Sequence, residues 1–305
     1  MHLQIDQAVA HIGEVLLGKE RQIRQALCCL ITGGHLLIED LPGMGKTTLA
    51  QALSTTLGLR FSRVQFTSDL LPADILGSAI FDRETAAFVF HPGPIFTQVL
   101  LADEINRATP RTQSALLEAM AEAQVSIEGK TRELPSPFFV IATQNPVHQS
   151  GTYPLPESQL DRFTMRLSLG YPSAAAEREL LLRTGSVVAT ASHSIIDAAQ
   201  LMVIRQATTA VSTTESLIDY VQRLVAFTRE SQEFTVGLSP RGALALVATA
   251  RTWALMEGRD FVIPEDIQAV LGPVVGHRLV PSADYSGDGN ALVALMLRDV
   301  DIIDS

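Results

Sequence analysis

The sequence predicts an α/β fold in which a parallel β-sheet is covered by helices on both sides, followed by an all-helical domain. In the first two thirds of the chain, short apolar runs alternate with stretches of helical periodicity. Several of these runs contain no polar residue, and strand-like runs become rare after Pro172. Strands that are apolar on both faces and separated by helices are typical of a parallel sheet buried between helical layers.

The expected elements follow in order along the chain. The strands are five short apolar or alternating runs, at 36–38, 61–66, 99–102, 138–142 and 165–169. Apolar residues at helical spacing follow the first strand over 47–57, and Thr109-Pro110 has the residue types of a helix start. Later helices are expected to begin at Ser239-Pro240 and at Pro264, and an amphipathic helical stripe lies between 217 and 225.

The change in character near Gly170 predicts two domains, an α/β core over 1–171 and a helical domain over 172–305. Both have ordinary sizes for a domain. Within the core, two β-hairpins are expected near 78–96 and 124–134, because each region has two short strand-like runs around a polar turn.

Composition and charge restrict the class of protein. The chain has 305 residues, of which 47% are hydrophobic, so it is globular and not disordered. It carries 23 Lys and Arg against 33 Asp and Glu, a net charge of −10, which disfavours a protein that coats nucleic acid. The adjacent Cys28 and Cys29 are poorly placed for a disulfide, which favours a reducing, cytoplasmic location. No signal peptide or membrane-inserted segment is expected.

A glycine-rich turn between the first strand and the next helix is the strongest local signal. Glycines allow successive backbone N–H groups to point at a phosphate in front of a helix N-terminus. Lys46 is then expected to reach the β- and γ-phosphates of a nucleotide, and the Thr47 hydroxyl to bind Mg²⁺. The pattern has Asp40 at its first glycine position, while Gly43 and Gly45 remain. The predicted phosphate loop is Asp40, Leu41, Pro42, Gly43, Met44, Gly45, Lys46, Thr47 and Thr48.

Two further strand ends carry polar side chains. The run 99–102 leads to Asp103 and Glu104, and the run 138–142 leads to Asn145. Asp103 is expected to bind Mg²⁺, largely through water. Glu104 is expected to orient and deprotonate an attacking water that Asn145 helps to hold. Taken singly, such residues are typical of solvated turns, but three strand ends that converge on one phosphate loop predict a nucleotide hydrolase.

Longer strings resemble the AAA+ ATPases, and within them the MoxR family of the helix-2-insert branch. They are LADEINRA at 101–108, QSALLEAM at 113–120, FVIATQNP at 139–146 and LPESQLDRF at 155–163. The resemblance extends from about residue 12 to residue 279 and departs from the family pattern at Asp40 and at Thr109. It implies a parallel-sheet P-loop core with a C-terminal helical lid, in which Lys46 and Thr47 are Walker A, Asp103 and Glu104 Walker B, and Asn145 sensor 1.

The resemblance also assigns residues outside the phosphate loop. Arg162 matches the arginine finger, which acts on ATP held by the neighbouring subunit, and Arg241 matches sensor 2 of the lid. Arg241 is expected in the first turn of a helix, where a cation is unfavourable unless an anion is near. A surface ion pair with Asp161 and a plain surface arginine are the respective alternatives. Leu17 and Gly18 resemble the stretch whose backbone meets adenine.

The resemblance thus implies an ATPase that acts with ATP and Mg²⁺ as a ring, expected to be a hexamer, and remodels client proteins as a chaperone does. It implies clients such as von Willebrand A-domain proteins, and a role in the maturation of metal-cofactor enzymes or cell-envelope complexes. A DNA-acting motor or loader is the main alternative, and it is disfavoured by the net charge of −10. A nucleotide-gated scaffold with little hydrolysis is a further alternative, suggested only by Asp40.

Overall fold

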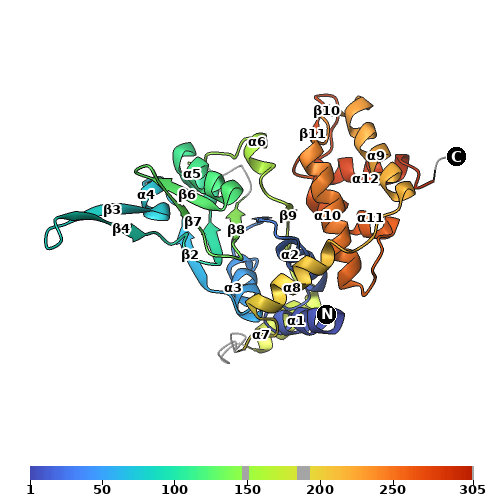
Figure 1. Ribbon diagram of the computed structural model, residues 1–305. Helices are drawn as coiled ribbons and strands as arrows, with labels where there is room; N and C mark the ends of the chain where they lie inside the picture. Colours follow the sequence, from blue (N-terminus) through green and yellow to red (C-terminus); the bar gives the residue numbers. More distant parts are fainter. Residues whose placement is uncertain (146–150, 184–192, 304–305) are drawn as a thin grey trace.

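The computed structural model describes residues 1–145, 151–183 and 193–303 (Figure 1). Its central sheet has five strands, and all neighbouring strands in it are parallel. Their spatial order is β2 (Phe61–Gln65), β5 (Val99–Asp103), β8 (Phe139–Gln144), β1 (Leu36–Glu39) and β9 (Met165–Leu167). The predicted parallel sheet is therefore confirmed, and β1 lies between β8 and β9.

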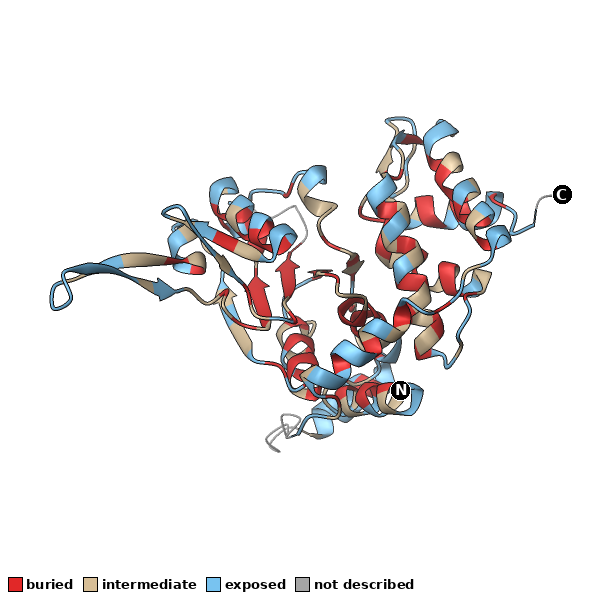
Figure 2. Ribbon diagram, viewed as in Figure 1, coloured by how far each residue is buried: buried red, intermediate tan, exposed pale blue. Residues whose placement is uncertain are grey.

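Helices cover both faces of this sheet, as the apolar strands require. On one face, Leu36 and Ile38 of β1 pack into a buried cluster with residues of α1 (His2–Val15), α2 (Glu20–Thr32) and α3 (Lys46–Thr56). The residue between them, Leu37, joins a second cluster that includes α5 (Pro110–Glu122) on the other face. The three central strands β5, β8 and β1 are accordingly almost entirely buried (Figure 2).

Both expected hairpins are present in the core. After the short helix α4 (Pro72–Leu76), β3 (Gly77–Asp82) pairs with β4 (Ala87–Pro92) in an arm that projects from the core (Figure 1). Strands β6 (Gln124–Ile127) and β7 (Lys130–Glu133) form the second hairpin. The hairpins meet where the Arg132 guanidinium lies 3.8 Å from the centre of the Phe90 ring.

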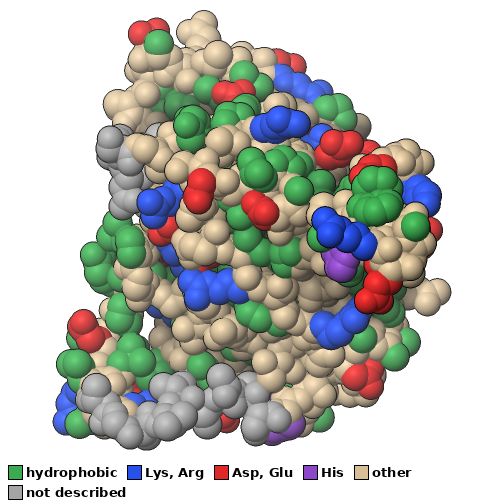
Figure 3. All heavy atoms as spheres, turned by 90° about the vertical axis from the view of Figure 1, so that its left-hand side faces the viewer, with side chains coloured by type: hydrophobic (Ala, Val, Ile, Leu, Met, Phe, Trp, Pro, Cys, Tyr) green, Lys and Arg blue, Asp and Glu red, His purple; other side chains and the backbone are tan. Residues whose placement is uncertain are grey.

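The base of the projecting arm depends on a glycine. Gly77 has a φ of +92°, and a Cβ there would lie 2.3 Å from the His91 carbonyl oxygen. Further along the arm, Ile80, Phe81, Phe88 and Val89 are between 39% and 69% exposed. Figure 3, which views the molecule from the side of the arm, shows hydrophobic side chains reaching the surface among charged ones.

The C-terminal region is mostly helical. Its helices are α7 (Ala174–Leu182), α8 (Ala198–Thr208), α9 (Glu215–Glu230), α10 (Pro240–Met256), α11 (Pro264–Val275) and α12 (Gly289–Asp299). One feature was not predicted, a short antiparallel pair formed by β10 (Phe234–Val236) and β11 (Val280–Pro281). Helix α8 lies beside α2 and α10, which joins this region to the core. The boundary between domains at residue 171 stays a prediction.

Two smaller expectations concern cysteines and membranes. Cys28 and Cys29 are both buried and free, as expected from their positions in α2. Across the described part of the chain, no helix has the length and apolar character needed to span a membrane.

Candidate active site

The phosphate loop lies between β1 and α3, as predicted, and two of its glycines are required by backbone geometry. Gly43 and Gly45 have φ values of +83° and +91°, which L side chains rarely adopt. Gly45 is the N-cap of α3, and no side chain caps this helix end. A Cβ added to Gly43 would meet nothing within 4 Å. The loop thus offers open space and uncapped N–H groups to an anion, which suits a nucleotide phosphate.

Lys46 lies at the start of α3 with only 8% of its surface exposed. Its ammonium Nζ donates to the Asp40 carbonyl oxygen at 2.5 Å and to Asn145 Oδ1 at 2.8 Å. Burial lowers the pKa of Lys46, while the nearby carboxylates of Asp40, Asp103 and Glu104 oppose this change. Two neutral oxygens, the Asp40 carbonyl oxygen and Asn145 Oδ1, thus hold the Lys46 ammonium at the phosphate loop.

Asp40 has a different role from the glycine of the general pattern. Its Oδ2 accepts hydrogen bonds from the backbone N–H groups of Leu169 and Gly170, each at 2.6 Å, and from Ser168 Oγ at 3.2 Å. Its φ is not in the left-handed region, so glycine is not required there. Oδ2 thus faces the segment after β9, while Oδ1 accepts from the Leu41 N–H at 2.9 Å and the backbone carbonyl accepts from Lys46.

Asp103 ends the buried strand β5 and is 7% exposed. Its Oδ1 accepts from Thr143 Oγ at 2.6 Å, and its Oδ2 accepts from Arg63 Nη2 of β2 at 2.6 Å. Strands β2, β5 and β8 therefore fix this carboxylate from both sides.

Glu104 follows Asp103 in a strained conformation, with a φ of +56°. Its N–H donates to Thr143 Oγ1 at 2.9 Å, which holds the turn. The carboxylate accepts from Asn145 Nδ2 at 3.1 Å, from Gln65 Nε2 at 2.9 Å and from Arg107 at 3.0 Å. Asn145 thus bridges Lys46 and Glu104, with its oxygen toward the ammonium and its amide nitrogen toward the carboxylate.

The metal ligands predicted by the sequence are Thr47 and Asp103. Thr47, in the first turn of α3, is half-buried. Among the residues that the structure describes, no group of three or more His, Cys, Asp or Glu side chains is arranged to hold a metal. The hydroxyl of Thr47 and the carboxylate of Asp103 suit Mg²⁺, which keeps several waters and takes substrate phosphates as ligands beside one or two protein groups.

The two arginines predicted from the family lie away from these contacts. Arg162 follows α6 (Glu157–Leu160), is half-buried, and donates from Nη1 to the Leu117 carbonyl oxygen at 3.0 Å. Arg241 is exposed in the first turn of α10. The described contacts do not bring either guanidinium to Lys46 or Glu104, so both roles stay predictions.

Leu17 and Gly18 form the turn between α1 and α2. Gly18 has a φ of +70°, and a Cβ there would lie 3.0 Å from the Cβ of Ala176 at the start of α7. The neighbouring Leu16 lies close to the phosphate loop, since its Cδ1 would be 2.8 Å from a Cβ on Gly45. The adenine contacts of Leu17 and Gly18 stay predictions.

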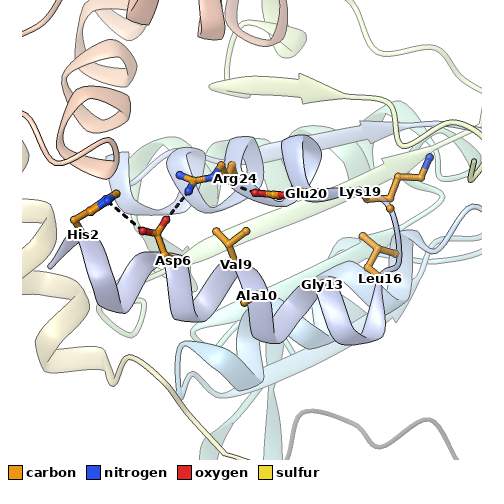
Figure 4. Close-up of a pocket in the computed structure, with 10 residues that line it drawn as sticks. His2, Asp6, Val9, Ala10, Gly13, Leu16, Lys19, Glu20 and Arg24 are labelled. Carbon is orange, nitrogen blue, oxygen red and sulfur yellow. Dashed lines mark hydrogen bonds and ion pairs between the residues drawn. The ribbon is translucent and has the colours of Figure 1, made fainter. Parts of the chain in front are cut away.

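A cavity of about 590 Å³ begins beside this turn and runs between α1 and α2. Figure 4 shows an ionic cluster at its far end, where Asp6 lies between His2 and Arg24. Lys19 points away from that cluster. Its Nζ donates to the carbonyl oxygens of Leu169 and Tyr171, each at 2.6 Å.

Four side chains that organise the site were missed by the sequence analysis. Arg63, Gln65 and Thr143 hold the two acidic residues, and Lys19 holds the segment after β9. Gln65 and Thr143 had a detectable signal, because each is a polar residue near the carboxyl end of a strand that neighbours β5. Arg63 lies in the middle of β2 and had no such signal. Lys19 binds backbone carbonyls, for which no side-chain pattern exists.

Comparison with known proteins defines the class to which this fold and site belong. Residues 35–165 match the model of the ATPase family associated with various cellular activities (AAA), and residues 226–294 match the AAA lid domain. The chain is therefore an AAA+ ATPase, in which a nucleotide-binding core is followed by a lid.

Relatives over the whole length define the family. The chain is 43% identical to the uncharacterized protein YeaC of Bacillus subtilis over 290 residues, 94% of this chain and 91% of that protein. It is 40% identical to chaperone MoxR1 of Mycobacterium tuberculosis, with 93% and 78% covered, and 31% identical to MoxR of Paracoccus denitrificans, with 97% and 94% covered. The chain belongs to the MoxR family.

A solved structure supports the same assignment. The crystal structure of a Cytophaga hutchinsonii protein, described as a candidate ATPase, superposes with a TM-score of 0.90 at 36% identity. The match covers 99% of this chain and 96% of the other. The core and the lid are thus both part of the shared fold.

Proposed function

We propose that this AAA+ ATPase hydrolyses ATP with Mg²⁺ at the site formed by the phosphate loop, Asp103, Glu104 and Asn145, and uses the energy to remodel client proteins. The observation that carries the catalytic part is the bridge of Asn145 between Lys46 and Glu104. It supports the proposed roles of Lys46 in phosphate binding and of Glu104 in water activation, because the two side chains lie on either side of one amide.

The residues of this chain divide the chemistry among them. The N–H groups at the start of α3 and the Lys46 ammonium bind the phosphates. Thr47 and Asp103 would hold Mg²⁺, which would neutralise charge on the phosphates. Glu104 takes a proton from the attacking water, which Asn145 orients. Because Gln65 and Arg107 also hold the Glu104 carboxylate, activity requires these contacts to rearrange when ATP binds.

Ring assembly is supported by the chemistry of Arg162. In the described contacts, its guanidinium uses Nη1 on the Leu117 carbonyl. An arginine has five N–H donors, so donors remain for a phosphate of the next subunit. We propose a ring, with a hexamer as the expected form, in which Arg162 completes the neighbouring site and Arg241 contacts ATP of its own subunit.

Client remodelling is supported by the projecting arm and by relatives. The arm carries exposed apolar residues, and such surfaces are common at protein contacts. A relative that is 40% identical is named a chaperone. We propose protein clients, with von Willebrand A-domain proteins as the class implied by the family. The net charge of −10 disfavours DNA as the client.

The test of hydrolysis is the Glu104→Gln variant. It should bind a fluorescent ATP analogue with Mg²⁺ as the native protein does, because the carboxamide keeps the size of the side chain and the proposed phosphate-binding residues are unchanged. It should release almost no phosphate at steady state. Glu122→Gln, an exposed acid at the end of α5, is the matched control and should keep full activity. Substantial phosphate release by Glu104→Gln would reject the assignment, and stimulation by DNA that falls steeply with salt would favour the DNA-acting alternative.

A further inference from the structure

The lid inserts one buried arginine into the segment of the core that carries Arg162. Arg278 follows α11, and only 4% of its side chain is exposed. Its Nε donates to Asp161 Oδ1 at 2.7 Å, and its Nη2 donates to the Phe163 carbonyl oxygen at 2.7 Å. Nη1 donates to the Thr164 carbonyl oxygen at 3.2 Å. The guanidinium thus binds residues on both sides of Arg162.

A second lid residue binds the same segment. His277 Nε2 lies 3.0 Å from the Phe163 carbonyl oxygen. Burial lowers the pKa of His277 well below its ordinary value, so the ring is neutral at pH 7, and Nε2 carries the hydrogen because a carbonyl only accepts. The Phe163 carbonyl therefore receives hydrogen bonds from two consecutive lid residues.

The same arginine contacts the lid helix that carries Arg241. A Cβ added to Gly242, the residue after Arg241, would lie 3.1 Å from Arg278 Cδ. The first turn of α10 thus lies close to the stem of Arg278. One buried side chain consequently connects the turn that bears Arg241 with the segment that bears Arg162.

We infer that Arg278 is the positioning residue for Arg162, so that the finger presented to the next subunit depends on the lid of its own subunit. This inference rests on the proposed trans role of Arg162. Asp161 and Phe163 are fixed by Arg278, and Arg162 between them has the Leu117 carbonyl as its hydrogen-bond partner in the described structure. A shift of the lid that moves Arg278 must therefore move the backbone on both sides of Arg162.

The test uses mixed rings, because an active site combines the Walker residues of one subunit with Arg162 of the next. Arg278→Met should lower phosphate release by about 10- to 100-fold, the range expected when a catalytic group is misplaced by about 1 Å. Its affinity for a fluorescent ATP analogue should be unchanged. Mixed with Glu104→Gln subunits, which supply an intact finger, Arg278→Met subunits should regain activity. Mixed with Arg162→Ala subunits, they should not, because both then lack a working finger.

Three results would overturn the inference. Rescue by Arg162→Ala but not by Glu104→Gln would place the effect of Arg278 in the ATP site of its own subunit. Rescue by neither would mean that Arg278→Met damages both the ATP site of its own subunit and the finger that it donates to the next subunit. Full activity of Arg278→Met alone would mean that the contacts do not position Arg162.

Two variants separate positioning from general destabilisation. Asp161→Asn removes only the charge of the side chain that pairs with Arg278. It should give the same rescue pattern as Arg278→Met, with a smaller loss of phosphate release. Arg259→Met removes a comparable arginine, bonded to Asp266 within the lid at 2.5 and 2.6 Å, and should not show a defect specific to finger donation. If Arg162→Ala is fully active, or is not rescued by Glu104→Gln, the trans role itself fails. Both Arg162→Ala and Glu104→Gln subunits have native Arg278. A failure of the trans role is therefore distinguished from a failure of the inference about Arg278.

Discussion

Replacement of Asp40 by glycine should destabilise this protein, although it restores the first glycine of the P-loop pattern G-x-x-x-x-G-K-[ST]. Asp40 is 8% exposed and its Oδ2 accepts two backbone N–H groups at 2.6 Å, those of Leu169 and Gly170. Since the φ of Asp40 is not left-handed, a glycine relieves no strain there. The variant therefore only removes contacts.

The size of the loss follows from which groups are left unpaired. A buried donor that loses its partner costs about 1–3 kcal/mol. Leu169 is 2% exposed and should be near the top of this range, whereas water reaches the half-exposed Gly170 and its loss should be about 1 kcal/mol. The added freedom of a glycine in the unfolded chain contributes about 0.5–1 kcal/mol. Together these terms predict a loss of about 3–5 kcal/mol in the free energy of unfolding.

Urea unfolding without nucleotide, followed by circular dichroism, measures this loss. Asp40→Asn should lie between the native protein and Asp40→Gly, because an amide has one acceptor oxygen where the carboxylate has two. Asp284→Gly, at an exposed position, is the matched control and should change stability only by the glycine entropy. Equal or greater stability of Asp40→Gly would refute this reasoning and would make Asp40 an ordinary departure from the pattern.

Three more predictions concern the site and its support. Thr143→Val removes the acceptor of the Glu104 N–H and the donor to Asp103, so kcat should fall by about tenfold or more with unchanged ATP affinity; an unchanged kcat would show that Thr143 does not hold Glu104. Arg63→Met removes a cation 2.6 Å from the Asp103 carboxylate, so less Mg²⁺ should be needed for half-maximal ATPase activity, and a higher requirement would contradict this. Burial lowers the pKa of His35 from 6.5 to about 4, so the unfolded chain binds one more proton between these values and stability falls as pH falls through this window, by up to about 1.4 kcal/mol per pH unit. His35→Gln should flatten that dependence in unfolding experiments, and an unaltered slope would contradict the assignment.

The sequence was sufficient for the residues that converge on the phosphate loop, and the reason is topological. Lys46 follows β1, Glu104 follows β5, and Asn145 follows β8. The three strands are adjacent and parallel, so their carboxyl ends share one edge. Apolar runs that end in polar residues can be recognised without a structure, and the parallel arrangement then brings those residues together.

The contacts made by Lys19, Asp40 and Arg278 could not be predicted in this way. Lys19 and Arg278 donate to backbone carbonyls, and Asp40 accepts from backbone N–H groups, more than 100 residues away in each case. Almost every residue has a backbone carbonyl and a backbone N–H group, so the sequence does not indicate which residue is the partner. Such contacts depend on how distant parts of the chain pack against one another, which neither periodicity nor a motif determines.

These unpredicted contacts concentrate on the chain that leads from the core to the lid. On the segment after β9, Asp40 holds the N–H groups of Leu169 and Gly170, while Lys19 holds the carbonyls of Leu169 and Tyr171. An anion and a cation thus fix the two hydrogen-bonding sides of one short peptide stretch. The carbonyl of Asp40 also accepts from Lys46. A movement of the Lys46 ammonium when phosphate binds is therefore transmitted to residues 169–171 through Asp40. The substitution that looks like a defect in the phosphate loop is, in the folded protein, the point where the loop is attached to the path toward the lid.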